Sequence, residues 1–474
     1  MSVTLHVSLI SGRAASLELR LDASISVLKQ RVQSALAVGG GKLLDQRGVV
    51  LHGAATIEDS GLREGDALTF HVGQVRISAC SAAAAAILED GSVMSWGDAE
   101  FGGDSSAVCS QLQNVVNIQA ASDAFAAILA DGSVVSWGDE DGGGDCSAVQ
   151  HQLKNVQKIQ ASLNAFAAIL DDGSVVTWGN PEFGGDSRHV QEQLQNVSQV
   201  QANERAFAAI AGDGSVVTWG DVDYGGSTAG SVKIQLKSVQ RIQASESAFA
   251  AILYDGTVAT WGDVWHGGDC SFVQEQLYGV QRIQAGSCAF AAILEDGSVV
   301  TWGDMEYGAD SSAVQSLLQD VQEIQASHTA FAAILGDRSV VTWGSSDRGG
   351  DCSAVQEQLH DVQCIQTTGH AFAALRVDGS VVTWGHAQKG GDSSAAQDQL
   401  TKVQQLQASE GAFAAILEDR SVVAWGLADY GGDDSELYDL QDVEQLQACE
   451  RGFAAVRGDG CIVTWGDPVC GRPE

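Results

Sequence analysis

The chain has 474 residues, of which 61 are acidic and 25 basic, so its formal net charge is −36. A surface this acidic repels nucleic-acid phosphates, which proteins bind through clusters of Lys and Arg, and direct nucleic-acid binding is therefore not expected. The charge favours a soluble protein with cationic partners, or a solvated acidic surface without a specific partner.

Cysteine usage and the lack of long apolar runs indicate the compartment. The ten Cys residues form no CxxC pair, and Cys146, Cys270 and Cys352 occupy one repeated position that other repeats fill with Ser, so metal ligation is not expected there. The sequence shows neither an N-terminal apolar signal segment nor a run long enough to span a membrane. Free thiols then favour a reducing compartment, the cytoplasm or the nucleus.

Residues 1–74 contain short alternating apolar and polar stretches around one helical segment. The alternation predicts strands at residues 3–7, 17–21, 49–51 and 68–72. Ser24 is placed to cap a helix in which Ile25, Leu28 and Val32 recur at helical spacing. The Gly-rich stretch at 39–42 is expected to break the chain. The predicted order is β-β-α-β-β.

This order, with the segments GVVLHG and TIEDSGLREGDALTFHV, resembles the ubiquitin-like β-grasp fold over residues 1–72. The resemblance implies a recognition module, occupying residues 1–74, whose exposed sheet face binds partners. Val50 and His71 fall near the matching positions of that face. No diglycine follows Val72, so conjugation is not expected. The alternative is a small folded cap with no role in the ubiquitin system.

One unit then recurs over residues 75–474, with IQAGSCAFAAILEDGSVVTWG at 283–303 as its clearest copy. The Trp residues of its WG pair are 41 residues apart, except for one interval of 42 and a final one of 40, and they are Trp96, Trp137, Trp178, Trp219, Trp261, Trp302, Trp343, Trp384, Trp425 and Trp465. A fixed period of this length is typical of solenoids and propellers.

Each repeat predicts three strands and a connector. Segments such as VQRIQA, AFAAIL and SVVTWG read as strands, and Asp-Gly between the second and third predicts a tight hairpin. Arg338 and Arg420 replace this Gly, so their hairpins are expected to be looser or to use another turn. The connector, GGDSSAVQEQL or similar, predicts a short helix.

The recurring aromatic residues and glutamines have structural roles in this interpretation. A three-stranded unit cannot bury both of its faces alone, so the Phe of AFAAIL and the Trp of WG are expected to pack between neighbouring repeats. The first repeat has Ala84 where the others have Phe. The Gln of each first strand is expected to bond from repeat to repeat, or to face a central channel.

The stretch AFAAILEDGSVVTWGDxxYGGDSS is similar to the regulator-of-chromosome-condensation repeat, a β-propeller repeat, over about residues 75–466. The resemblance implies a mainly β protein built of blades. Gly-Gly-Asp-Ser replaces the usual Gly-Gln-Leu-Gly after the Trp, and the short unit favours blades of three strands. Ten repeats exceed the seven that usually close, so a wide propeller-like ring is expected, with an open spiral as the alternative.

No catalytic constellation, cofactor motif or metal-binding motif stands out, so an enzyme is not expected. The repeated Asp residues after WG and after Gly-Gly admit calcium as an alternative to ordinary turn capping. The loop between WG and GG varies from repeat to repeat and carries aromatic residues. We expect an exposed partner-binding ring there, formed by Phe101, Phe183, Tyr224, Trp265, Tyr307 and Tyr430.

Three functions compete on this evidence. The first is a monomeric, non-catalytic scaffold that binds proteins, either basic ones or members of the ubiquitin system. The second, implied by the family resemblance, is a guanine-nucleotide exchange factor for a small GTPase, although the uniformity of the repeats argues against one specialised face. The third is a structural repeat protein without a specific ligand.

Overall fold

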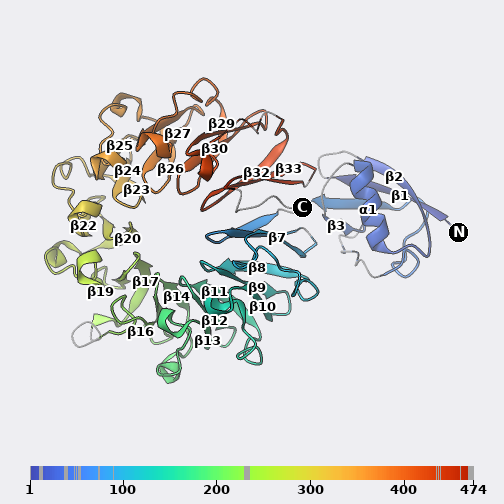
Figure 1. Ribbon diagram of the computed structural model, residues 1–474, viewed down its shortest axis with the longest axis horizontal. Coiled ribbons are helices and arrows are strands. Elements are labelled where there is room, and N and C mark those ends of the chain that lie inside the picture. Colours follow the sequence, from blue (N-terminus) through green and yellow to red (C-terminus); the bar gives the residue numbers. More distant parts are fainter. Residues whose placement is uncertain are drawn as a thin grey trace.

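The computed structural model describes residues 2–9, 14–36, 41–46, 49, 51, 55–72, 75–88, 90–228, 235–433, 435, 437, 439–459 and 461–467. Figure 1 shows two parts: a small N-terminal domain, and a wide ring of blades around a central opening. None of the described helices is long and apolar enough to cross a membrane.

The N-terminal domain is a mixed four-stranded sheet with one helix on it. Its elements are β1 Ser2–Leu9, β2 Ala14–Arg20, α1 Ile25–Leu36, β3 Gly41–Leu44 and β4 Ala67–Val72. The strand order is β2-β1-β4-β3, with β1 and β4 parallel and the other pairs antiparallel. This is the expected β-grasp arrangement.

The helix begins as predicted, because the Ser24 hydroxyl accepts a hydrogen bond from the Val27 amide at 3.3 Å. The predicted break at 39–42 extends too far, because its last two residues belong to β3, which starts at Gly41. Leu43 of β3 is buried in the core. The amide of Leu51 donates to the carbonyl of Leu43, so Leu51 lies against β3. Neither Val49 nor Leu51 is in a strand, and Val50 of the predicted strand lies outside the described residues.

The described part of the ring contains ten three-stranded antiparallel sheets, the blades. The first strands lie nearest the central opening (Figure 1) and are β5 Arg76–Ala79, β8 Val115–Ala120, β11 Val156–Ala161, β14 Gln199–Ala202, β17 Val239–Ala244, β20 Val280–Ala285, β23 Val321–Ala326, β26 Val362–Thr367, β29 Val403–Ala408 and β32 Val443–Cys449.

The middle strand of each blade is the buried AFAAIL segment. These strands are β6 Ala83–Ile87, β9 Ala124–Leu129, β12 Ala165–Leu170, β15 Ala206–Ile210, β18 Ala248–Leu253, β21 Ala289–Leu294, β24 Ala330–Leu335, β27 Ala371–Arg376, β30 Ala412–Leu417 and β33 Gly452–Arg457.

The third strand carries the WG pair and lies farthest from the opening. These strands are β7 Val93–Gly97, β10 Val134–Gly138, β13 Val175–Gly179, β16 Val216–Gly220, β19 Val258–Gly262, β22 Val299–Gly303, β25 Val340–Gly344, β28 Val381–Gly385, β31 Val422–Gly426 and β34 Ile462–Gly466.

Single helical turns connect these strands. The loops after WG contain a π-type turn at η1 Glu140–Gly144 and 3-10 turns at η2 Pro181–Phe183, η4 Val264–His266, η6 Met305–Tyr307, η7 Ser346–Arg348, η9 Ala387–Lys389 and η10 Ala428–Tyr430. The expected connector helices are 3-10 turns in three repeats, η3 Gln191–Gln193, η5 Gln274–Gln276 and η8 Gln356–Gln358.

The predicted packing of aromatic rings between repeats is confirmed. Phe166 lies opposite Trp178 in the register of β12 and β13, and their ring centroids are 5.2 Å apart. The pair packs on Ala124 and Ala126 of the preceding blade, where small side chains leave room for the rings. The Trp178 indole also donates its Nε1–H to the carbonyl of Gly143 at 3.1 Å. Each blade therefore completes the core of the one before it.

The ring closes, and the open spiral is not formed. Val75, Ala84 and Trp96 of the first blade share one buried cluster with Ala454 and Val456 of the last. This seam lacks a Phe ring, because Ala84 stands at that position. The buried Trp96 Nε1 also makes no hydrogen bond among the described residues. Without that ring, the seam buries less aromatic surface than the interfaces that contain a Phe–Trp pair.

The hairpins that contain Arg338 and Arg420 keep the same turn as the others, so the expectation of a different turn is wrong. Both Arg residues have φ of 65°, against 78° for Gly297 at the matching position. The Asp337 carboxylate accepts hydrogen bonds from the amide and hydroxyl of Ser339 at 2.9 and 2.6 Å. These bonds hold the turn although a non-glycine residue is strained there.

Candidate functional site

The central opening is bordered by the turn between the first and middle strand of each blade. One residue per turn, three positions before the Phe, recurs around it. We call these the mouth residues: Ser81, Ser122, Leu163, Glu204, Glu246, Ser287, His328, Gly369, Glu410 and Glu450. All ten line two adjoining depressions of about 640 and 390 Å³, which share Glu204 and Glu450.

Backbone hydrogen bonds join the mouth residues from one blade to the next. The amide of Ser122 donates to the carbonyl of Leu163 at 2.8 Å, and the Leu163 amide donates to Glu204 at 2.9 Å. The same bond recurs at Glu246, His328, Gly369 and other turns. Because the backbone is held directly, the side chain at this position is free to vary without loss of the ring.

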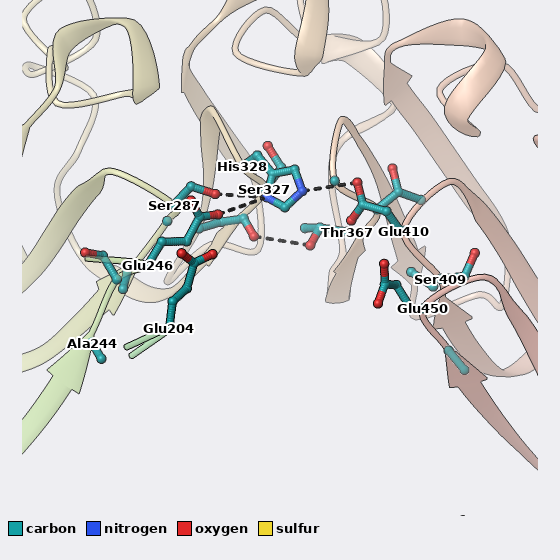
Figure 2. A pocket seen from close by; sticks show the side chains of 18 of the residues that line it. Glu204, Ala244, Glu246, Ser287, Ser327, His328, Thr367, Ser409, Glu410 and Glu450 are labelled. Atoms are coloured by element: carbon teal, nitrogen blue, oxygen red, sulfur yellow. Dashed lines mark hydrogen bonds and ion pairs between the residues drawn. The ribbon is translucent and has the colours of Figure 1, made fainter. Parts of the chain in front are cut away.

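The mouth is chemically divided. Apart from the shared Glu204 and Glu450, the smaller depression has Ser81, Ser122 and Leu163, whereas the larger one adds the carboxylates of Glu246 and Glu410 and the imidazole of His328. Burial, followed by the nearby Glu246 carboxylate, raises the pKa of Glu204. Burial also raises the pKa of Glu450. Neither the Glu204 nor the Glu450 side chain makes a polar contact with another described residue (Figure 2).

His328 bridges two carboxylates across the mouth, as Figure 2 shows. Its Nε2 lies 3.1 Å from Glu410 Oε1, and its Nδ1 lies 2.9 Å from Ser287 Oγ and 4.0 Å from Glu246 Oε1. The intervening blade contributes Gly369, where a Cβ would lie 2.1 Å from Glu410 Oε1. The absence of a side chain at Gly369 therefore lets His328 reach Glu410 two blades away.

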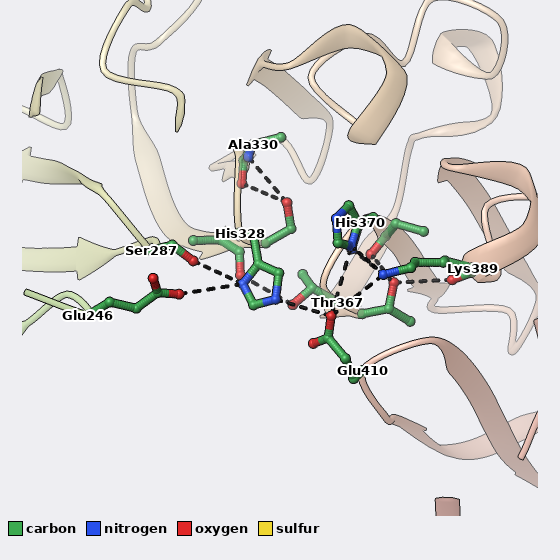
Figure 3. Close-up of polar contacts among 12 residues, drawn as sticks. Glu246, Ser287, His328, Ala330, Thr367, His370, Lys389 and Glu410 are labelled. Carbon is green, nitrogen blue, oxygen red and sulfur yellow. Dashed lines mark hydrogen bonds and ion pairs between the residues drawn. The ribbon is translucent and has the colours of Figure 1, made fainter. Parts of the chain in front are cut away.

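A second imidazole and a lysine complete this network (Figure 3). Lys389 Nζ lies 3.0 Å from His370 Nδ1 and 3.8 Å from Glu410 Oε1. Burial, followed by Lys389 and Arg348, lowers the pKa of His370 to about 4. A neutral His370 can accept a hydrogen bond from the Lys389 ammonium.

The two partners in the bridge favour their charged forms. The hydrogen bond to Glu410 raises the pKa of His328 against the effect of burial. Burial acts to raise the pKa of Glu410, but the hydrogen bond with His328 and the nearby cations outweigh it and lower the pKa. His328 and Glu410 thus form a part-exposed ion pair, and the free carboxylates beside them attract cationic groups.

The WG loops lie at the same end of the blades as the mouth, because the Asp139 amide donates to the carbonyl of Asp123 at 2.8 Å. We call this end the loop face. The repeated Asp residues cap the loops, as at Asp98, whose carboxylate accepts from the Glu100 amide at 2.9 Å. Turn capping thus accounts for them, and the described residues contain no cluster of three or more metal-ligating side chains.

The predicted ring of exposed aromatic residues is wrong in its geometry. Only Trp265 is largely exposed, at 79%. The other five are half-buried and pack on the core of the following blade: Phe101, Phe183, Tyr224, Tyr307 and Tyr430. These five stand at the third loop position, which points toward the next blade, whereas Trp265 stands at the second.

Arginines cover three of these half-buried rings. The Arg205 guanidinium lies 4.5 Å from the Phe183 centroid and 5.2 Å from that of Tyr224, and Arg451 lies 5.8 Å from that of Tyr430. Such cation–π contacts tie neighbouring loops together. These contacts give the three rings a structural role. The partner-binding role of the aromatic side chains stays a prediction.

The large exposed apolar side chains of the loops instead gather at the first and second loop positions of three successive blades. We call Val222, Val264, Trp265 and Met305 the rim patch. The neighbouring Asp223 and Glu306 are exposed as well. The rim patch was not distinguished from the other loop residues by sequence, although three of its members share one repeat position.

The N-terminal candidates are not brought together with these groups. Val50 lies outside the described residues, and His71 lies on β4, with a side chain that is not described. The open face of the sheet is polar where it is described, with His6 Nδ1 2.8 Å from Ser16 Oγ. An apolar recognition patch is therefore not seen among those residues.

In several repeats, the recurring Cys or Ser residue after Gly-Gly-Asp hydrogen-bonds to a Gln four residues further along the chain. Cys146 Sγ lies 3.1 Å from Gln150 Oε1, as Ser311 Oγ lies 2.9 Å from Gln315 Oε1. No two of the described cysteines are joined to each other in a disulfide.

No family model and no curated protein matches the chain. Solved structures share low similarity with it. Prp20p from Saccharomyces cerevisiae matches with 13% identity and a TM-score of 0.34, over 58% of this chain and 82% of its own. Human WBSCR16 has 16% identity and a TM-score of 0.31, over 58% and 76%. The computationally designed Ika8 protein has 15% identity and a TM-score of 0.31, over 66% and 96%. Likenesses this weak carry no argument about function.

Proposed function

We propose that this protein is a non-catalytic scaffold that binds other proteins through the loop face of its ring. The observation that carries the proposal is the rim patch, because Val264 and Trp265 are large and exposed, and the loops of the two neighbouring blades carry the exposed acidic residues Asp223 and Glu306. Aromatic and aliphatic groups inside a polar rim are typical of protein interfaces.

The charge of the chain defines the partner's chemistry. With a net charge of −36 and free carboxylates at Glu204 and Glu450, the loop face attracts a partner whose own surface joins apolar side chains to Lys or Arg. Electrostatic attraction of this kind speeds association and suppresses acidic competitors. The β-grasp domain offers a second surface, which we propose recruits ubiquitin-system proteins, and the cytoplasm or nucleus is the proposed location.

Affinity capture with the full chain tests the proposal. The double variant Val264→Asp/Trp265→Asp should lose a set of basic proteins that the unaltered chain retains. Phe272→Asp, which changes an exposed apolar residue outside the rim patch, is the matched control and should retain them. Each retained protein is then purified and titrated against the three chains, and a partner that binds all three equally would contradict the assignment.

Two further arms separate the alternatives. A chain without residues 1–74 should lose any ubiquitin-system proteins while keeping the partners of the ring. Nucleotide release from a panel of small GTPases should be unchanged by the full chain, and accelerated release would instead support an exchange factor.

A further inference from the structure

The wall of the central channel carries an unexpected group of cations. The residue before the apolar Ile, Val or Leu of each first strand varies among repeats, and four blades have a basic residue there: Arg76, Lys158, Arg241 and Arg282. Only 25 of the 474 residues are basic, and this single position holds four of them. Arg241 and Arg282 lie on the neighbouring strands β17 and β20.

The geometry of the first strand directs these side chains toward the following blade. A register shift between Val239 and Arg241 is followed by regular pairing, in which Ile242 packs on the preceding blade. Side chains alternate along a strand, so Arg241 and Gln243 face the other way. There they meet β20 and line a depression of about 270 Å³ that extends to β23.

The polar groups of this depression are only partly used. Arg282 donates to the carbonyl of Gln322, and Glu323 accepts from the Gln325 amide at 2.7 Å. The Arg241 guanidinium makes no hydrogen bond or ion pair with any other described residue, and neither does the Gln243 side chain. Two guanidinium groups at matching positions of adjacent strands repel each other, and a bound anion would remove that repulsion.

We propose that this depression binds a small anion bearing a carboxylate or phosphate group. The Arg241 guanidinium is the principal contact, because its planar fork of N–H donors matches both groups. Arg282 supplies a second positive charge, and the amides of Gln243 and Gln284 supply neutral donors. Glu323 borders the same space and limits the charge and size of the ligand. The site uses the channel wall rather than the loop face, so it is independent of the proposed scaffold function.

Calorimetric titration of the full chain with citrate and with pyrophosphate tests this site, and the two probes separate carboxylate from phosphate. At least one should bind at millimolar concentration or below. Arg241→Gln should weaken it about tenfold or more, as expected for loss of a charge-assisted hydrogen bond. Lys158→Gln, the same change at the matching position of another blade, should alter affinity by less than about twofold.

A second pair of variants tests whether removal of a negative charge strengthens anion binding. Glu323→Gln should strengthen binding, whereas Glu275→Gln, which removes an exposed carboxylate from η5, should not. Failure of both probes to bind the unaltered chain would overturn the proposal. Equal weakening by Arg241→Gln and Lys158→Gln would also overturn it, because that result indicates general attraction to the channel instead of a site.

Discussion

Phe290 and Trp302 lie opposite each other on β21 and β22, with ring centroids 5.3 Å apart and planes inclined by 14°. The pair packs on Ala248 and Ala250 of the preceding blade, and Phe290 is fully buried. The same relationship recurs in every described blade except the first, where Ala84 stands opposite Trp96. One Phe–Trp pair therefore joins each of these blades to the one before it.

Truncation of one such ring should be costly. Phe290→Ala is expected to lower the free energy of unfolding by about 3–5 kcal/mol, because it removes a buried ring and leaves a cavity between two blades. Urea denaturation followed by circular dichroism measures the change. Trp265→Ala, at an exposed position, is the control and should change it by less than about 0.5 kcal/mol. Similar values for both variants would contradict the packing described above.

The seam between the first and last blades should open before the other interfaces. It has Ala84 in place of Phe, and Trp96 Nε1 lacks an acceptor among the described residues. Hydrogen exchange read by mass spectrometry should therefore show faster exchange in β6 and β33 than in β21. Equal protection of these three strands would mean that the seam is as stable as the rest of the ring.

The strained hairpins offer a gain in stability. Arg338→Gly should raise the free energy of unfolding by about 1 kcal/mol, because φ of 65° is strained for Arg and accessible to Gly. The reverse comparison is Gly297→Ala, which should destabilise the protein. Its φ is 78°, and a Cβ would lie 2.8 Å from the Cα of Asp320. Thermal unfolding of both variants checks the pair, and a loss of stability in Arg338→Gly would contradict the turn assignment.

The His328–Glu410 pair should make stability depend on pH. The pKa of His328 is raised above its ordinary value of 6.5, so the stability that protonated His328 contributes is lost as pH rises from 6.5 through the raised value. The pKa of Glu410 is lowered from 4.5, so the stability that its carboxylate contributes is lost as pH falls from 4.5 through the lowered value. Glu410→Gln should lower the His328 pKa and should destabilise the protein more at mildly acidic than at alkaline pH. Imidazole proton resonances report the titration. An unchanged His328 pKa in the variant would contradict the bridge.

His370 should titrate in the opposite sense. Its pKa is lowered to about 4 from 6.5, so the folded state binds fewer protons than the unfolded state between these values. Stability therefore falls as pH decreases through this window. His370→Gln should reduce that fall, measured as the shift in thermal midpoint between neutral and acidic buffer. A variant with the same pH dependence as the unaltered chain would contradict a half-buried, neutral His370.

Much of the architecture was predictable because it repeats. The period, the Asp-Gly hairpins and the recurring Phe and Trp specify three-stranded blades that must pack on each other, and residues such as Trp178 lie where the pattern places them. Whether the ring closes could not be predicted from the repeats. Closure depends on the small rotation between successive blades, and the repeat sequences do not reveal that angle. The seam at Ala84 closes without a distinct sequence signal.

The candidate site was less accessible from sequence. The mouth residues share one position but differ in type, so no periodic motif marks Glu204, His328 or Glu410. Their mutual contacts join residues whole repeats apart and depend on the side-chain gap at Gly369. The sequence also did not show which loop side chains point outward. Trp265 is exposed because it stands at the second loop position, whereas the third position faces the next blade.

Ten blades close into one ring. Each of the first nine packs against the Phe and Trp of the following blade, and the last packs against the first without a shared strand. End-on class averages from electron cryomicroscopy test it most directly. We predict ten spokes around a central opening, with an additional small domain. A gapped or spiral particle, or a ring with another number of spokes, would contradict it.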